Sequence, residues 1–122
     1  MSDEAPAVLG IAALAVDCAE PAALADWWRR LLGGSVEVDD DGDATLYTLD
    51  VDELTIDFAR VPEAKTVKNR LHLDLRTTDL GAAIEQAIAL GATRADDIYD
   101  GGRWQVMRDP EGNEFCLLRP EF

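Results

Sequence analysis

The chain has 122 residues, 48% of them hydrophobic and 30% charged, a balance typical of one folded domain rather than a disordered chain. Its formal net charge of −14 argues against nucleic acid or an anionic membrane surface as a partner, because both need a basic patch. The two cysteines form no disulfide framework, no apolar run approaches the ~20 residues of a membrane span, and no basic leader is visible, so we expect a cytoplasmic protein.

The first half of the chain predicts one strand, one helix and three further strands. Residues 9–16 are apolar throughout and indicate a buried strand. Pro21 fits the first turn of a helix over residues 22–32, where large apolar side chains recur at helical spacing before two glycines end it. Short extended segments follow at residues 35–38, 44–49 and 54–61, the first two separated by an acidic turn.

The second half repeats this order after a polar linker at residues 62–69. Residues 71–77 alternate strictly, which predicts a strand with Leu71, Leu73 and Leu75 on one face and His72 and Asp74 on the other. Thr78 or Asp79 can cap a helix that ends at Gly91. Residues 92–99 are extended or irregular, and strands at 103–108 and 114–118 flank a tight turn.

The helix ends align at LLGG (31–34) and ALGA (89–92), which indicates an internal repeat of about 58 residues. We therefore predict an α+β fold in one domain spanning residues 1–122. Two tandem βαβββ modules, residues 8–61 and 70–119, would form a curved eight-stranded mixed sheet with both helices on its convex face. Its concave face would form a ligand groove. The side chains expected to face this groove are Ala13, Thr55, Asp57, Ala59, His72, Asp74, Glu114 and Cys116.

Four segments in this order resemble the vicinal oxygen chelate superfamily, which includes glyoxalase I, extradiol dioxygenases and the bleomycin and fosfomycin resistance proteins. They are LADWWRRLLG (24–33), KNRLHLDL (68–75), ALGA (89–92) and DPEGNEFCL (109–117). The small bacterial glyoxalase-like domains are the most similar group. The resemblance implies the paired βαβββ fold, commonly assembled as a homodimer.

The resemblance also implies positions for a divalent metal, held in the family by a His on the first strand and a Glu on the last strand of each module. His72 matches the first-strand position of module two, and Cys116 matches its last-strand position. In module one, Ala13 falls at the first position and Asp57 or Ala59 at the last. Only one of the four family ligands is kept in kind, which disfavours the full metal site.

Three interpretations of the site remain open. In the first, the groove binds a small, partly aromatic organic molecule without a metal, and the ligand-binding residues are Trp28, Tyr47, Asp57, His72, Asp74, Trp104 and Cys116. In the second, Asp57, His72 and Cys116 form a divergent site for Zn, Ni, Mn or Fe in a lyase or dioxygenase. In the third, His72 is the catalytic acid or base of a metal-free enzyme, with Asp74 or Asp57 as its carboxylate partner.

Overall fold

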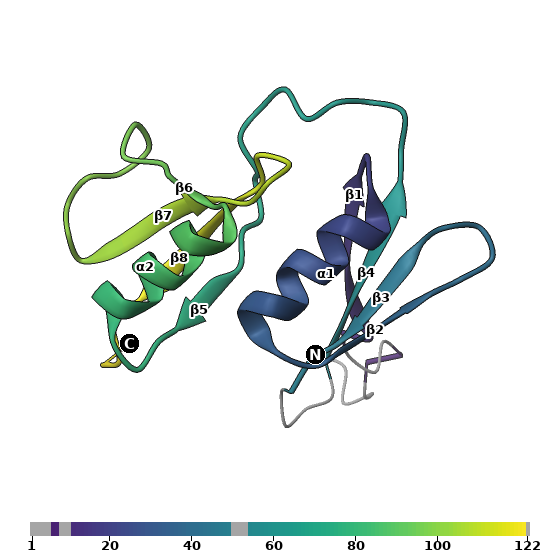
Figure 1. Cartoon of the computed structure of the whole chain (residues 1–122), viewed down its shortest axis with the longest axis horizontal. Helices are drawn as coiled ribbons and strands as arrows, with labels where there is room; N and C mark the ends of the chain where they lie inside the picture. The colour runs from purple at the N-terminus through teal and green to yellow at the C-terminus, as the bar shows by residue number, and fades with distance from the viewer. Residues whose placement is uncertain (1–5, 8–10, 50–53, 122) are drawn as a thin grey trace.

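The computed structural model describes residues 6–7, 11–49 and 54–121, and these form two modules that lie side by side (Figure 1). Each module contains one helix and four strands. The elements of the first module are β1 (Ala13–Cys18), α1 (Pro21–Leu32), β2 (Ser35–Val38), β3 (Ala44–Tyr47) and β4 (Thr55–Arg60). The elements of the second are β5 (Asp74–Arg76), α2 (Leu80–Leu90), β6 (Thr93–Arg94), β7 (Trp104–Arg108) and β8 (Glu114–Leu118).

The strands pair within their own module. Sheet A has the order β1-β4-β3-β2 and sheet B the order β5-β8-β7-β6; in each, the first and last strands of the module run parallel. The predicted α+β fold of tandem βαβββ modules is thereby confirmed. Among the described residues, no strand of one module pairs with a strand of the other, so the eight strands form two four-stranded sheets instead of the single eight-stranded sheet that was predicted. Both helices cover the same side of these sheets (Figure 1).

Local signals account for both helices. Pro21 occupies the first turn of α1, and Gly33 ends it by donating its N–H to the Arg29 carbonyl. Asp79 caps α2, as predicted, by accepting the Ala82 N–H at 3.1 Å. Gly91 then ends α2 in the left-handed region at φ 111°, which residues with a Cβ rarely adopt.

One apolar core joins the modules. On β4, buried Ile56 and Phe58 alternate with half-buried Thr55 and Asp57, so one face of sheet A packs against α1. Helix α1 also contacts the second module, where Trp27 and Trp28 meet Phe115 of β8 edge to face, at centroid distances of 5.9 and 4.8 Å.

The turn between β7 and β8 fastens α1 through two carboxyl groups. Buried Asp109 accepts the Trp28 indole N–H at 2.9 Å and also accepts N–H groups of Asn113 and Glu111. Glu111 accepts the backbone N–H groups of Ala19 and Glu20, just before α1, at 2.7 and 3.0 Å. The turn predicted from its residues 109–113 therefore also holds the first module to the second.

Several predicted boundaries need correction. Strand β5 begins at Asp74 rather than Leu71, and Leu71 is 89% exposed instead of facing the core. Strand β3 ends at Tyr47, two residues before the predicted end. The start of the strand predicted over residues 9–16 falls partly outside the described residues, and β1 continues to Cys18. The described helices include none that is long and apolar enough to cross a membrane.

We predict that Trp28→Phe destabilises the fold more than Trp27→Phe does. Both changes remove an indole N–H; that of Trp27 donates to the neutral Leu90 carbonyl at 2.9 Å, whereas that of Trp28 donates to a buried carboxyl group. Loss of a hydrogen bond to a charged group costs about 1.5–3 kcal/mol, against about 0.5–1.5 kcal/mol for a neutral pair. Urea unfolding followed by circular dichroism measures the difference, and equal losses would contradict this account.

Candidate functional site

A pocket of about 480 Å³ opens on the face of sheet B that points away from the helices. Phe115 and Leu117 of β8 pack into the core, so Glu114, Cys116 and Leu118 face the other way. The residues that line the pocket are Lys68, His72, Asp74, Ile98, Tyr99, Trp104, Val106, Glu114, Cys116 and Leu118.

Three side chains with metal-binding or acid–base chemistry meet in this pocket. Asp74 and Cys116 are direct partners in the parallel pairing of β5 and β8, and His72 lies two residues before Asp74 on the same side. The His72 Nδ1 is 2.7 Å from Asp74 Oδ1 and 3.8 Å from Cys116 Sγ. The predicted pairing of His72 with a carboxylate is thereby confirmed, and the partner is Asp74.

An aromatic wall stands in the same pocket. The rings of Tyr99 and Trp104 stack with centroids 4.0 Å apart and an interplanar angle of 7°. Ile98 and Tyr99 come from the loop between β6 and β7, and Trp104 begins β7. The pocket therefore combines a flat apolar wall with a polar group made of His72, Asp74 and Cys116.

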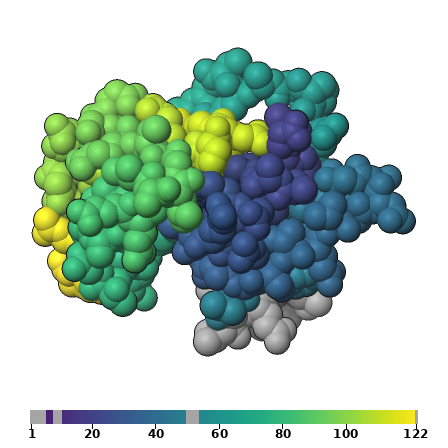
Figure 2. Space-filling view, in the orientation of Figure 1, coloured from purple at the N-terminus to yellow at the C-terminus, as the bar shows by residue number. Residues whose placement is uncertain are grey.

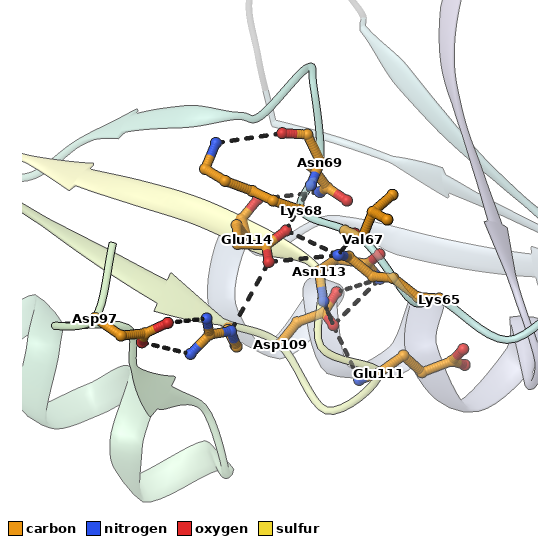
Figure 3. A network of polar contacts seen from close by, with 10 residues as sticks. Lys65, Val67, Lys68, Asn69, Asp97, Asp109, Glu111, Asn113 and Glu114 are labelled. Atoms are coloured by element: carbon orange, nitrogen blue, oxygen red, sulfur yellow. Dashed lines mark hydrogen bonds and ion pairs between the residues drawn. The ribbon is translucent and has the colours of Figure 1, made fainter. Parts of the chain in front are cut away.

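The linker is fastened along the edge of this pocket by Glu114 (Figure 3). The Glu114 side chain is 5% exposed and accepts the Asn69 backbone N–H at 2.8 Å, while Lys65 Nζ lies 3.0 Å from the same carboxylate oxygen. The Arg108 Nε lies 3.8 Å from the Glu114 Oε2, and the Arg108 guanidinium forms a bidentate salt bridge with Asp97. These contacts place Lys68 at the pocket. In the space-filling view, the linker arches over an open gap (Figure 2).

The groups that surround Glu114 favour the ionised form of its carboxyl group. Burial raises the pKa of this carboxyl, but the Asn69 N–H and the Lys65 ammonium outweigh burial and hold the pKa below its usual value. A lowered pKa in the folded state stabilises the fold above the pKa of the unfolded chain. That contribution is lost as the pH falls through the lowered folded value, so acid weakens the attachment of the linker to Glu114.

Cys116 is unsuited to act as a nucleophile at neutral pH in the structure as it stands. Burial raises the pKa of its thiol to about 11, with further increases from the Asp74 charge and hydrogen bond and a smaller opposing effect of Lys68. His72 also contacts Asp74 and Cys116 through the same nitrogen, whereas a nucleophile–histidine–acid relay uses both ring nitrogens.

Three of the residues predicted to bind a ligand lie outside this pocket. Trp28 is 4% exposed in the core and bonded to Asp109, so the expectation that it lines the groove is wrong. The Tyr47 hydroxyl donates to Glu37 on the outer surface of sheet A. Asp57 accepts the Thr45 hydroxyl at 3.0 Å in sheet A, so the predicted set of Asp57, His72 and Cys116 does not meet in one chain.

Sequence reasoning missed Tyr99, Ile98 and Lys68. Tyr99 and Ile98 belong to a segment with no periodicity, so nothing local indicated which way the side chains point. Lys68 was assigned to a polar linker, and only the long-range contacts of Glu114 bring that linker to the pocket. A tyrosine five residues before Trp104 was the one visible signal for the aromatic wall.

Strand register tests the metal positions that the family resemblance implies. Two pairs of partner residues on the parallel strands, Ala15 with Asp57 and Asp74 with Cys116, have the same separation along the sequence. When the two modules are aligned in sequence by their helix N-caps, Glu20 and Asp79, Ala13 aligns with His72 and Asp57 aligns with Cys116. Ala13 has no donor atom, so these residues do not fit the four-ligand set of the family.

We predict that Cys116 alkylates slowly at neutral pH in the metal-free protein. The rate for the Cys18→Ser variant, in which Cys116 is the one thiol, should rise about tenfold per pH unit between pH 7 and 10, because only the thiolate reacts. Asp74→Asn should shift this profile to lower pH by removing the neighbouring negative charge. Iodoacetamide labelling followed by mass spectrometry measures the rate, and a plateau below pH 9 would show an activated thiolate instead.

Known structures with low sequence identity share this fold. A glyoxalase/bleomycin resistance/dioxygenase family enzyme from Burkholderia phytofirmans matches with a TM-score of 0.68 at 17% identity, covering 88% of this chain and 96% of that chain. A hypothetical protein from S. aureus matches with a TM-score of 0.70 at 9% identity, covering 93% and 95%. The fosfomycin resistance protein FosX from Listeria monocytogenes, complexed with Mn(II) and sulfate, matches with a TM-score of 0.65 at 13% identity, covering 90% and 91%.

The family comparison spans both modules. No curated protein matches the chain significantly. The model of the glyoxalase-like domain family matches residues 13–118, from the start of β1 to the end of β8. The chain therefore belongs to the glyoxalase-like domain family and has the fold of the glyoxalase/bleomycin resistance/dioxygenase superfamily.

Proposed function

We propose that the chain binds a small, partly aromatic organic molecule in the pocket of sheet B. The observation that carries this proposal is the stacked pair of Tyr99 and Trp104 in the same pocket as His72 and Asp74. A flat apolar wall suits a ring system, and the polar group suits a hydroxyl, carboxyl or amine at one end of it. The volume of about 480 Å³ suits a ligand of drug size.

The described residues on the matching face of sheet A carry different chemistry. The positions equivalent to His72 and Asp74 are Ala13 and Ala15, which have no polar side chain to orient a ligand. Asp57 is the polar residue at the position equivalent to Cys116, and Thr45 hydrogen-bonds to it. These differences support a binding site formed by the second module.

A second candidate function is proton transfer by His72 in a metal-free enzyme. The short contact between His72 Nδ1 and Asp74 favours it, because a carboxylate that orients one ring nitrogen leaves the other available to a ligand. The two candidates separate in the His72→Ala variant. Under this second candidate, the variant still binds a compound that the wild type converts but no longer converts it.

The ligand proposal predicts that a screen of small aromatic compounds and antibiotics by isothermal titration calorimetry yields a binder with a Kd below about 100 μM. Trp104→Ala should weaken that binding at least about tenfold, because it removes half of the aromatic wall. Tyr47→Ala is the matched control and should leave binding unchanged, since Tyr47 lies on the outer surface of sheet A. Absence of any binder, or equal losses in both variants, would exclude the proposal.

We also propose that two copies of the chain associate, as the family resemblance implies. Strands β1 and β5 are edge strands within the described part of the chain, and exposed edges favour pairing with another chain. Leu71, 89% exposed just before β5, and Val67 in the linker, 75% exposed, add apolar surface near one of these edges.

Light scattering should give twice the mass of one chain, and Leu71→Lys should lower the apparent mass toward that of a monomer. Ile88→Lys changes an exposed apolar side chain on α2 and should leave the mass unchanged. A wild-type protein that remains monomeric at high micromolar concentration would contradict the dimer.

A further inference from the structure

Three different donor atoms converge at one point of the pocket. An imidazole nitrogen of His72, a carboxylate oxygen of Asp74 and the Cys116 sulfur all lie within 4.8 Å of one another. The parallel register fixes this arrangement, because it sets Asp74 opposite Cys116 and leaves His72 two residues away on the same side of the sheet. The strand pairing therefore brings the three side chains together, and their rotamers then bring the donor atoms close.

The spacing of these atoms suits a metal ion between them. Tetrahedral zinc with ordinary bonds to nitrogen, oxygen and sulfur spaces its ligand atoms about 3.3–3.8 Å apart. The distance from His72 Nδ1 to Cys116 Sγ is already 3.8 Å, and the 2.7 Å contact with Asp74 needs to lengthen by less than about 1 Å. His72 and Asp74 are exposed to the pocket, so the ion can reach them from solvent.

We propose that His72, Asp74 and Cys116 form a three-donor site for Zn²⁺ that lies entirely within the second module. A set of nitrogen, oxygen and sulfur favours zinc, whereas Mn²⁺ prefers oxygen-rich ligands. Asp74 is not one of the positions that the family resemblance implies for a metal, and Asp57 takes no part in the site. The site differs in this way from the four-ligand arrangement, which Ala13 cannot complete.

The experiment uses the full chain, stripped of metal with a chelator and titrated with Co²⁺. We expect a sulfur-to-cobalt charge-transfer band in the near ultraviolet together with the visible bands of tetrahedral cobalt, both displaced by one equivalent of Zn²⁺. Cys116→Ser should abolish the charge-transfer band, and His72→Ala and Asp74→Asn should each weaken Zn²⁺ binding at least about tenfold. Mn²⁺ should bind at least about tenfold more weakly than Zn²⁺.

Two control variants decide where the site lies. Cys18→Ser removes the other buried cysteine, and Asp57→Asn removes the carboxylate at the matching position of the first module. Both should bind Co²⁺ and Zn²⁺ as the wild type does. A charge-transfer band that disappears in Cys18→Ser, or an equal loss of affinity in Asp57→Asn and Asp74→Asn, would overturn the proposal.

A labelling measurement covers the case in which Cys116→Ser does not fold. In the Cys18→Ser background, saturating Zn²⁺ should slow iodoacetamide labelling of Cys116 at least about tenfold, because a metal-bound sulfur is a poor nucleophile. The Asp74→Asn variant of the same background should lose this protection. Unchanged labelling in the presence of Zn²⁺, together with no cobalt spectrum, would refute the site.

Discussion

The buried hydrogen bond between the Trp28 indole and the Asp109 carboxyl is the constraint on which the arrangement of the two modules depends. Asp109 holds its own turn closed through Asn113, so the same carboxyl shapes the entry to β8 and anchors α1. Glu111 of that turn holds the backbone just before α1. An unpartnered buried carboxyl is costly, so the helix and the turn are held in one relative position. Strand β8 begins directly after the turn, and it supplies Glu114 and Cys116 to the pocket.

The two modules share a backbone plan but differ in the chemistry of their outer faces. The same parallel register that joins Ala15 to Asp57 in sheet A joins Asp74 to Cys116 in sheet B. In sheet B this register brings an imidazole, a carboxylate and a thiol together, and the loop after β6 adds an aromatic wall. Glu114 then ties the linker to the pocket edge (Figure 3). The second module therefore carries the features that we assign to binding, while the first supports it through α1.

Short-range patterns predicted most of the fold and part of the site. Strand β8 and the end of α2 at Gly91 match their predicted positions, because alternation, caps and glycine act over a few residues. For the carboxylate partner of His72, Asp74 and Asp57 were both open, and the structure has Asp74, the one close to His72 in sequence. Trp28 was wrongly placed in the groove because its partner, Asp109, lies far along the chain. Tyr99 was missed because the pocket position of an irregular loop depends on tertiary contacts.

We infer that the ligand-binding and metal-binding residues of this protein lie in the second module. Backbone amide shifts recorded by NMR during a titration of the metal-free chain with Zn²⁺ test it residue by residue. The account predicts that the shifts concentrate at residues 72–74 and 114–118 and at the adjoining strand β7, with little change at residues 13–15 and 55–59 of sheet A. Shifts of similar size on both sheets, or none at residues 72–74, would contradict it.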